Sequence, residues 1–130
     1  MTSYYLDTSV AIHAFTRNPR AVEWFNEATA DPTASVLSSR LLRTEMTRYL
    51  RREGIEVARR AEILDYVAFL AITDSVLATA EAITEHVRTL DAIHIASALA
   101  TGAEVMVSHD TRLLEVAEFL GFDVLDPVAG

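Results

Sequence analysis

The sequence predicts an α/β fold of three layers, with a central parallel sheet of about five short strands flanked by helices. Short apolar runs, which suit buried strands, alternate along the chain with longer segments in which apolar residues recur at helical spacing. Parallel neighbours need a long crossover connection, so this alternation favours a parallel sheet. No linker or low-complexity tract interrupts the 130 residues, and 51% of them are hydrophobic, so we expect a single domain over residues 1–130.

The first half of the chain is expected to contain two strands and four helices. The strands cover residues 3–6 and 34–37, and the helices cover residues 9–16, 19–30, 39–53 and 56–66. Asn18-Pro19 separates the first two helices, because proline suits the first turn of a helix but not its interior. Ser38-Ser39 provides an N-cap for the third helix, and Gly54 is placed to end it.

The second half is expected to contain three strands and three helices. The strands cover residues 69–72, 104–107 and 122–125, and the helices cover residues 73–86, 90–101 and 111–120. Thr73-Asp74 begins the first of these helices, while Gly102 and Gly121 end the other two.

The composition excludes several kinds of chemistry. The chain has no cysteine, so it has no disulfide, no thiolate nucleophile and no cysteine-ligated zinc. All eleven basic residues are arginine, so no mechanism that needs a lysine is available. The N-terminus lacks the basic segment of a targeting signal, and the longest apolar stretch, Tyr66–Ile72, is too short to span a bilayer. We therefore expect a cytoplasmic protein with no membrane partner.

The arginines are concentrated in one part of an otherwise acidic chain. The formal net charge is −8, yet residues 40–60 hold seven arginines and only three acids. A solvated helix face is one explanation, and contact with the phosphates of a nucleic acid is the other. The predicted contact residues are Arg40, Arg43, Arg48 and Arg51.

Two aspartates follow expected strands. Asp7 comes directly after the first strand, and Asp110 comes shortly after the fourth. Aspartate after a strand commonly caps the next helix, and this explanation suits Asp110 with Thr111 well. In open parallel sheets, however, sites gather beyond the carboxyl ends of the strands. Both aspartates are therefore candidates for a common site.

Two further acids lie on apolar helix faces. Glu45 falls within the stripe formed by Leu42, Met46 and Tyr49, and a carboxylate there is costly unless it is paired. A rim position or a pairing with an arginine would also explain it. Asp91 shares a face with Ile95, although an acid in the first helical turn is favourable in itself. Clustered carboxylates need a cation, and oxygen ligands suit Mg²⁺ or Mn²⁺.

The ordered set of motifs resembles the PIN-domain family and, within it, the VapC-type toxins of bacterial toxin–antitoxin pairs. The matching stretches are Tyr4–Ser9, Glu45 in its arginine-rich helix, Leu90–Ala96, Val107–Leu114 and Leu120–Pro127. The resemblance covers nearly the whole chain in the right order. It implies an endoribonuclease that depends on Mg²⁺ or Mn²⁺, acts on RNA, forms a homodimer and is inhibited by a cognate antitoxin protein.

The resemblance also implies roles for individual residues. Asp7, Glu45, Asp91 and Asp110 would form the catalytic acidic quartet, with Asp7, Asp91 and Asp110 as the expected metal ligands. A small hydroxyl residue accompanies the acids in this family, and the candidates here are Thr8, Ser9 and Ser108. Ser108 stands where many members carry threonine. His94 and His109 are weaker candidates for a general base, and packing or the orientation of another group is the alternative role for His94.

Two other functions are compatible with acids after strands. One is a catalytically inactive PIN-fold interaction module, which a metal titration would distinguish from a nuclease. The other is an aspartate-dependent phosphotransfer protein, but such families rely on a lysine that this chain lacks.

Overall fold

All strands of the sheet run in the same direction, as the alternation of strands and helices predicts. The computed structural model describes residues 1–130 and contains five strands. They are β1 (Thr2–Leu6), β2 (Ala34–Ser39), β3 (Ala68–Leu70), β4 (Val105–Val107) and β5 (Asp123–Leu125). Their order across the sheet is β3-β2-β1-β4-β5, and every neighbouring pair is parallel.

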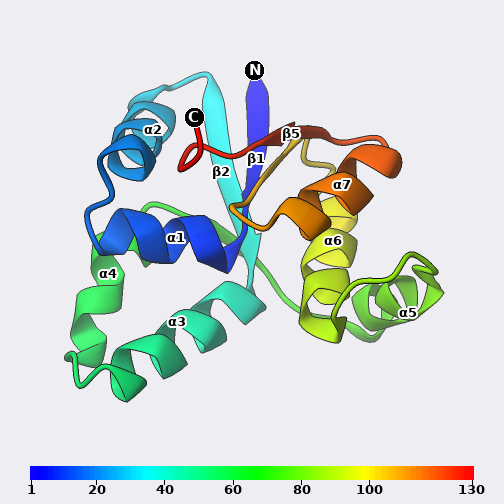
Figure 1. The fold of residues 1–130 in the computed structure, drawn as a ribbon, viewed down its shortest axis with the longest axis horizontal. Coiled ribbons are helices and arrows are strands. Elements are labelled where there is room, and N and C mark those ends of the chain that lie inside the picture. Colours follow the sequence, from blue (N-terminus) through cyan, green and yellow to red (C-terminus); the bar gives the residue numbers. More distant parts are fainter.

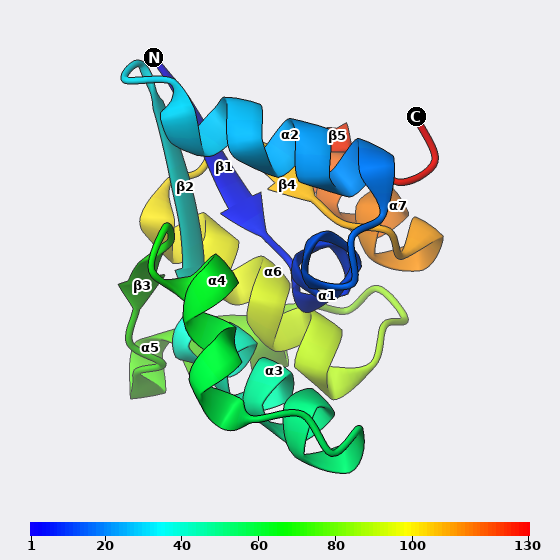
Figure 2. The ribbon, with the colours of Figure 1, turned by 90° about the vertical axis from the view of Figure 1, so that its left-hand side faces the viewer.

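Helices cover both faces of this sheet, which confirms the three-layer α/β fold. They are α1 (Thr8–Phe15), α2 (Pro19–Ala30), α3 (Arg40–Arg52), a 3₁₀ helix η1 (Val57–Arg60), α4 (Ala61–Leu64), α5 (Asp74–Ala82), α6 (Thr89–Thr101) and α7 (Thr111–Phe119). Figures 1 and 2 show α1 and α2 on one side of β1, and α6 and α7 on the other. None of these helices combines the length and the apolarity needed to cross a bilayer.

The side chains of β1 alternate between two hydrophobic cores. Leu6 packs with residues of α1, α2 and α3 in the first core, and Tyr4 lies against the same cluster. Tyr5 points to the opposite face and packs with Ile95 of α6 and Met106 of β4. This alternation is the normal geometry of a strand buried on both sides. It also places the Tyr5 hydroxyl beneath α6, where the site described below needs it.

Two expected helices are shorter than the sequence predicts. The helix expected over residues 56–66 is instead η1 followed by the single turn α4, because β3 already begins at Ala68 and pairs with Leu37. The helix expected over residues 73–86 ends at Ala82. There the chain becomes extended at Ile83, and this lets both Ile83 and Val87 pack against the second core. The remaining boundaries agree with the expected ones to within one or two residues.

Candidate active site

The carboxyl ends of β1 and β4 lie side by side in the middle of the sheet. Leu6 is paired with Val107, and the Asp7 amide donates a hydrogen bond of 2.9 Å to the Val107 carbonyl. From β1 the chain continues to β2 on one side, whereas β4 and β5 lie on the other side. This is the topological switch point of the sheet, where open α/β folds form their sites. Asp7 and Ser108 are the first residues beyond it.

Asp7 stands at the N-cap position of α1, but its carboxylate does not cap the helix. Instead, the Ser9 and Ser108 hydroxyls both donate to Asp7 Oδ2, each at 2.8 Å. The residue is 5% exposed. Two hydroxyl donors therefore hold one oxygen of a buried carboxylate. Asp7 Oδ1 receives no hydrogen bond, and its nearest cationic neighbour is the His94 ring at 3.4 Å. Helix capping thus does not explain Asp7.

Glu45 is held in the same way from the side of α3. The Thr8 hydroxyl donates to Glu45 Oε1 at 2.6 Å, and His94 Nε2 donates to the same oxygen at 2.7 Å. Glu45 Oε2 has no hydrogen-bond partner. Burial acts to raise the pKa of this carboxyl, but the hydrogen bonds from His94 and Thr8 outweigh it, and the pKa is lowered. Glu45 is therefore an ionised carboxylate with one oxygen held and one oxygen available.

His94 lies beneath these two carboxylates and is 1% exposed. Its Nδ1 is 2.8 Å from the Tyr5 hydroxyl, which donates its only proton to Ser39 Oγ at 3.0 Å. Nδ1 must therefore be the donor towards Tyr5, just as Nε2 is the donor towards Glu45, since a carboxylate only accepts. A ring that donates from both nitrogens is an imidazolium. Burial alone would lower the pKa of His94, but the hydrogen bond to Glu45 and the charge of Asp7 raise it to about 10.

Asp91 and Asp110 form a second pair of carboxylates, held by an exposed arginine. Arg88 bridges them, with Nε 2.9 Å from Asp91 Oδ2 and Nη2 3.1 Å from Asp110 Oδ2. Asp110 Oδ1 accepts from the Leu113 amide, so its expected role as the N-cap of α7 is confirmed. Asp91 Oδ1 has no partner. Burial is the main reason that the pKa of Asp91 is raised, Arg88 opposes it, and the charges of Asp110 and Asp7 add to it.

Short contacts connect the four acids predicted from the sequence into one cluster. Ser108 joins Asp7 to Asp110, because its oxygen also accepts from the Asp110 amide at 3.0 Å. His94 joins Asp7 to Glu45, and Arg88 joins Asp91 to Asp110. Each predicted hydroxyl residue lies in this network: Thr8 binds Glu45, while Ser9 and Ser108 bind Asp7. We call these four acids, with His94 and Arg88, the acid cluster.

Three residues of this network were not assigned by the sequence. For His94 the sequence offers a general base, packing or the orientation of another group without choosing among them, and it assigns no role to Tyr5 or Arg88. A histidine between the apolar residues Ile93 and Ile95 was a usable signal, because a buried imidazole needs partners at both nitrogens. His109, the other candidate base, pairs with Asp126 at 2.9 Å rather than with any of the four acids.

The cluster is chemically suited to a divalent cation. Its donors are all carboxylate oxygens, the ligands that hard ions such as Mg²⁺ and Mn²⁺ prefer. Asp7 Oδ1, Glu45 Oε2 and Asp91 Oδ1 are free of hydrogen bonds, so the network leaves one oxygen of each residue for another ligand. As they stand, no three acidic or histidine side chains are gathered tightly enough to hold a metal. Arg88 bridges two of these acids, and its side chain is 79% exposed.

The predicted RNA-binding arginines lie outside the acid cluster. Arg40, Arg43, Arg48 and Arg51 are exposed residues of α3 and make no ion pair with a carboxylate. Glu45 and Arg43 are two residues apart, which places them about 200° apart around the helix axis. The helix thus presents Glu45 to the cluster and turns Arg40, Arg43 and Arg51 away from it, whereas Arg48 lies only about 60° from Glu45 around the helix axis.

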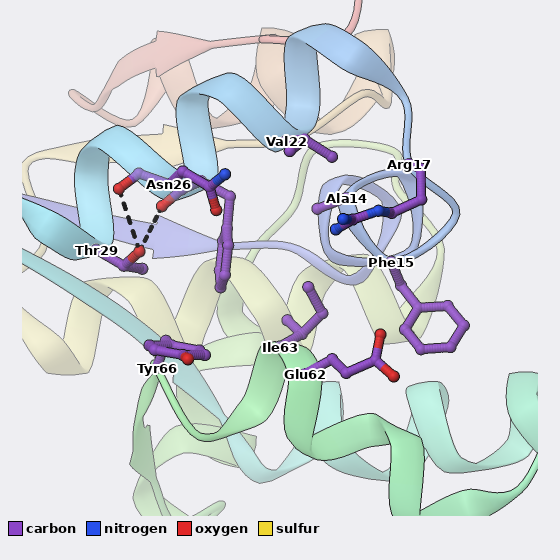
Figure 3. A pocket seen from close by; sticks show the side chains of 10 residues that line it. Ala14, Phe15, Arg17, Val22, Asn26, Thr29, Glu62, Ile63 and Tyr66 are labelled. Atoms are coloured by element: carbon purple, nitrogen blue, oxygen red, sulfur yellow. Dashed lines mark hydrogen bonds between the residues drawn. The ribbon is translucent and has the colours of Figure 1, made fainter.

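Another pocket, of about 370 Å³, opens between α1, α2 and α4 and is shown in Figure 3. None of the four acids lines it. Its one carboxylate, Glu62, is already paired with Arg59 at 2.8 Å. It therefore lacks the converging carboxylates that distinguish the acid cluster, which is the stronger candidate for a catalytic centre.

Comparison with known proteins identifies the family. A relative in Mycobacterium tuberculosis, ribonuclease VapC46, is 33% identical over 134 residues, covering 98% of this chain and 99% of that protein. A toxin–antitoxin complex from Klebsiella pneumoniae contains a chain of similar fold, with a TM-score of 0.74 at 18% identity and coverage of 95% and 97%. VapC20 of M. tuberculosis, a toxin that cleaves the sarcin–ricin loop, has a TM-score of 0.68 at 19% identity and coverage of 92% and 95%. The PIN-domain family model matches residues 4–119, and the chain belongs to the PIN-domain family.

Proposed function

We propose that this protein is a divalent-metal-dependent endoribonuclease that hydrolyses RNA phosphodiester bonds as the toxin of a toxin–antitoxin pair. The observation that carries the proposal is the arrangement of the acid cluster, in which Asp7, Glu45 and Asp91 each leave one oxygen free. Membership of the PIN-domain family and the ribonuclease relative that spans nearly the whole chain support it. An antitoxin partner is proposed from the toxin–antitoxin complexes among the similar structures.

In this proposal Asp7, Asp91 and Asp110 hold the cation, which is Mg²⁺ or Mn²⁺. A bound divalent cation would offset charge on the scissile phosphate and make water a stronger nucleophile. Glu45 faces the same space and accepts or orients a proton of water through its free oxygen, Oε2. Its other oxygen stays fixed by Thr8 and His94. No residue of the chain needs to act as a covalent nucleophile.

His94 is a positioning residue in this scheme, because it acts through Glu45 and Asp7 rather than on the substrate. Both of its ring nitrogens are occupied, and it is buried beneath the carboxylates. Its positive charge offsets the negative charges of Glu45 and Asp7, and its hydrogen bond to Glu45 helps to lower the pKa of that carboxyl. Thr8, Ser9 and Ser108 serve the same purpose by donating hydrogen bonds to individual carboxylate oxygens.

Three further parts of the proposal come from the sequence and the family. The arginines Arg40, Arg43, Arg48 and Arg51 contact the RNA backbone, which would make binding depend on salt. The protein forms a homodimer and acts in the cytoplasm. Sedimentation at high micromolar concentration tests the dimer directly, and a purely monomeric protein would contradict it.

The alternative function is a PIN-fold module that binds a partner without catalysis. The contacts to Glu45 and Asp7 argue against it, because a buried carboxylate network is costly and these residues contribute no helix cap. An aspartyl-phosphate mechanism is disfavoured by the absence of lysine.

Substitution of Asp7 or Asp91 by asparagine tests the proposal. Asparagine keeps the size but removes the charge that attracts the metal, so RNA cleavage in Mg²⁺ or Mn²⁺ should fall by at least about a thousandfold, the scale of losing an essential catalytic group. Metal should raise the melting temperature of the wild type and raise that of both variants less. The matched control is Asp123→Asn, an exposed aspartate on β5 outside the acid cluster.

Two outcomes would contradict the proposal. Full cleavage by the Asp7→Asn and Asp91→Asn proteins would show that the acid cluster is not the catalytic centre. A wild type that neither cleaves RNA nor gains stability with Mg²⁺ or Mn²⁺ would favour the interaction module.

A further inference from the structure

A groove lined by arginine lies between α3 and the segment that contains η1 and α4. Two adjoining hollows make it up, with volumes of about 260 and 480 Å³, and both are lined by Arg40, Arg43 and Arg60. Figure 2 shows α3 and α4 next to each other on the side of the molecule that faces the viewer. The smaller hollow is completed by Thr44, Thr47 and Arg48 and has no acidic or apolar residue in its lining. We call the two hollows together the arginine groove.

The charge of the arginine groove is unusual for this chain. The protein has a formal net charge of −8, yet four arginine side chains border the smaller hollow and none is paired with a carboxylate. Their mutual repulsion is unfavourable in the absence of an anion. Arg60 is held in place by a hydrogen bond of 2.8 Å from Nη1 to the Thr47 hydroxyl. The rest of its guanidinium is therefore presented at a defined position, as phosphate recognition requires.

The larger hollow adds an exposed aromatic ring. Phe69, on the edge strand β3, lines this hollow and is 38% exposed. Phe69 is in register with Ser38 near the end of β2, and Arg40 follows two residues later, so the ring and the arginine share the carboxyl edge of the sheet. The same hollow contains one acid, Asp65, which is exposed. An exposed ring beside unpaired guanidinium groups is the combination used to bind single-stranded nucleic acid.

We propose that the arginine groove binds a single-stranded segment of RNA that flanks the cleaved bond. The guanidinium groups of Arg43 and Arg60 contact backbone phosphates, and an unpaired base stacks on Phe69. A double helix does not fit this role, because its bases are stacked on one another and expose no face to the ring. An acidic protein segment would use the arginines but would leave the ring without a planar partner. The inference deepens the proposed ribonuclease function and rests on it.

The position of the groove decides which step it affects. Glu45 faces the acid cluster, and Arg43 lies about 200° away on the same helix. Arg40, Arg43 and Thr47 thus line the groove from the side of α3 that faces away from Glu45, and none of the four acids lines it. It supplies binding energy at a distance from the reaction. Its loss should raise KM and the dissociation constant while changing kcat far less than the loss of an acid does.

The test measures binding separately from cleavage. An Asp7→Asn protein and a fluorescent twelve-nucleotide single-stranded RNA are titrated at several salt concentrations. Arg43→Gln combined with Arg60→Gln should weaken binding and reduce the log–log salt slope by about 1.4, since each lost phosphate contact on a single strand contributes roughly 0.7. Phe69→Leu should weaken binding about fivefold or more and leave the salt slope unchanged.

Matched controls and a second variant keep the result interpretable. Arg112→Gln removes an exposed arginine on α7, and Phe119→Leu removes a 74% exposed ring there, so neither should alter binding. Arg43→Gln alone preserves the contact between Arg60 and Thr47, and it should reduce the salt slope by about 0.7 if the double variant fails to fold.

Three results would overturn the inference. The first is equal affinity of the groove variants and the controls while the wild type still cleaves RNA, which would leave the proposed function intact. The second is equal binding of a fully duplex RNA. The third is a Phe69→Leu protein that changes from dimer to monomer, which would assign this face to contact between subunits. A wild type that binds and cleaves no RNA would refute both proposals together.

Discussion

The acid cluster has two halves that are neutralised in different ways. The inner half, Asp7 and Glu45, rests on His94, a buried imidazolium whose two nitrogens are both engaged. The outer half, Asp91 and Asp110, is bridged by Arg88, whose side chain is 79% exposed. Charge pairing at an exposed position contributes little free energy and is easily exchanged, whereas breaking a buried pair is costly. The inner half is therefore fixed, and the outer half can exchange its cation.

This difference suggests how a cluster of four acids folds before any metal is bound. His94, which is itself buried, compensates Asp7 and Glu45 and keeps their carboxylates oriented. Arg88 compensates the other two only until a stronger cation displaces it. A metal entering from the solvent would then meet a site whose inner oxygens are already in position, and only one exposed side chain would have to move.

Removal of His94 should lower the free energy of unfolding more than removal of Arg88 does. His94→Leu leaves Glu45 and Asp7 without their buried cation, so we expect a loss of about 3 to 5 kcal/mol in the free energy of unfolding. His94→Gln retains one donor towards Glu45 and should recover part of that loss. Denaturant unfolding measures the stability of both, and a KM-against-kcat analysis should show that kcat falls in His94→Gln while KM changes little. Stability equal to that of the wild type in His94→Leu would refute the charged inner pair.

The pH dependence of stability sharpens the same comparison. The pKa of His94 is raised to about 10 in the folded protein, compared with 6.5 as its ordinary value. A raised pKa means that its contribution is complete below about pH 6.5 and is lost as the pH rises towards 10. With metal removed by a chelator, the difference in unfolding free energy between wild type and His94→Gln should shrink over this range. A constant difference would indicate that His94 is neutral.

Removal of Arg88 should change the stability of the protein least. It should strengthen the binding of metal. Arg88→Gln is expected to change the free energy of unfolding by less than about 1 kcal/mol, because the side chain is exposed. It should tighten Mn²⁺ binding about two- to fivefold by removing a competing cation, which calorimetry can measure. Arg112→Gln is the control. It likewise removes an exposed arginine that is ion-paired, in this case with Glu115, which lies outside the acid cluster. Weaker Mn²⁺ binding in Arg88→Gln would show that Arg88 supports the metal site.

The sequence predicts the fold and the helix caps well, because the residues that determine them are close together in the chain. Ser39 and Asp110 cap the helices that follow them, as their positions indicate. Glu45 lies within an apolar stripe, and that pattern places it towards the interior, where the structure brings it to Asp7. The catalytic roles of these acids stay predictions, and so does contact of Arg40, Arg43, Arg48 and Arg51 with RNA.

What the sequence does not reveal is the partner of each buried polar group. His94 depends on Tyr5, which lies 89 positions away, and on Glu45, which lies 49 positions away. Helical and strand periodicities relate only residues a few positions apart, so they could not predict either contact. Arg88 reaches Asp91 within one helical turn, but its bridge to Asp110 depends on how α6 and α7 meet. The arginine groove likewise requires η1 to fold back onto α3, and only then does Arg60 meet Thr47.

The pairing of β4 with β1 also determines when a newly made chain can become active. Asp7 and the Ser108 hydroxyl that holds it are 101 positions apart, and β4 lies in the interior of the sheet beside β1. A ribosome that has made only the first hundred residues has produced β1, β2 and β3 but neither Ser108 nor Asp110. We expect such a nascent chain to be unable to cleave RNA. Cleavage would therefore begin only after β4 and the segment that carries Ser108 and Asp110 have been made.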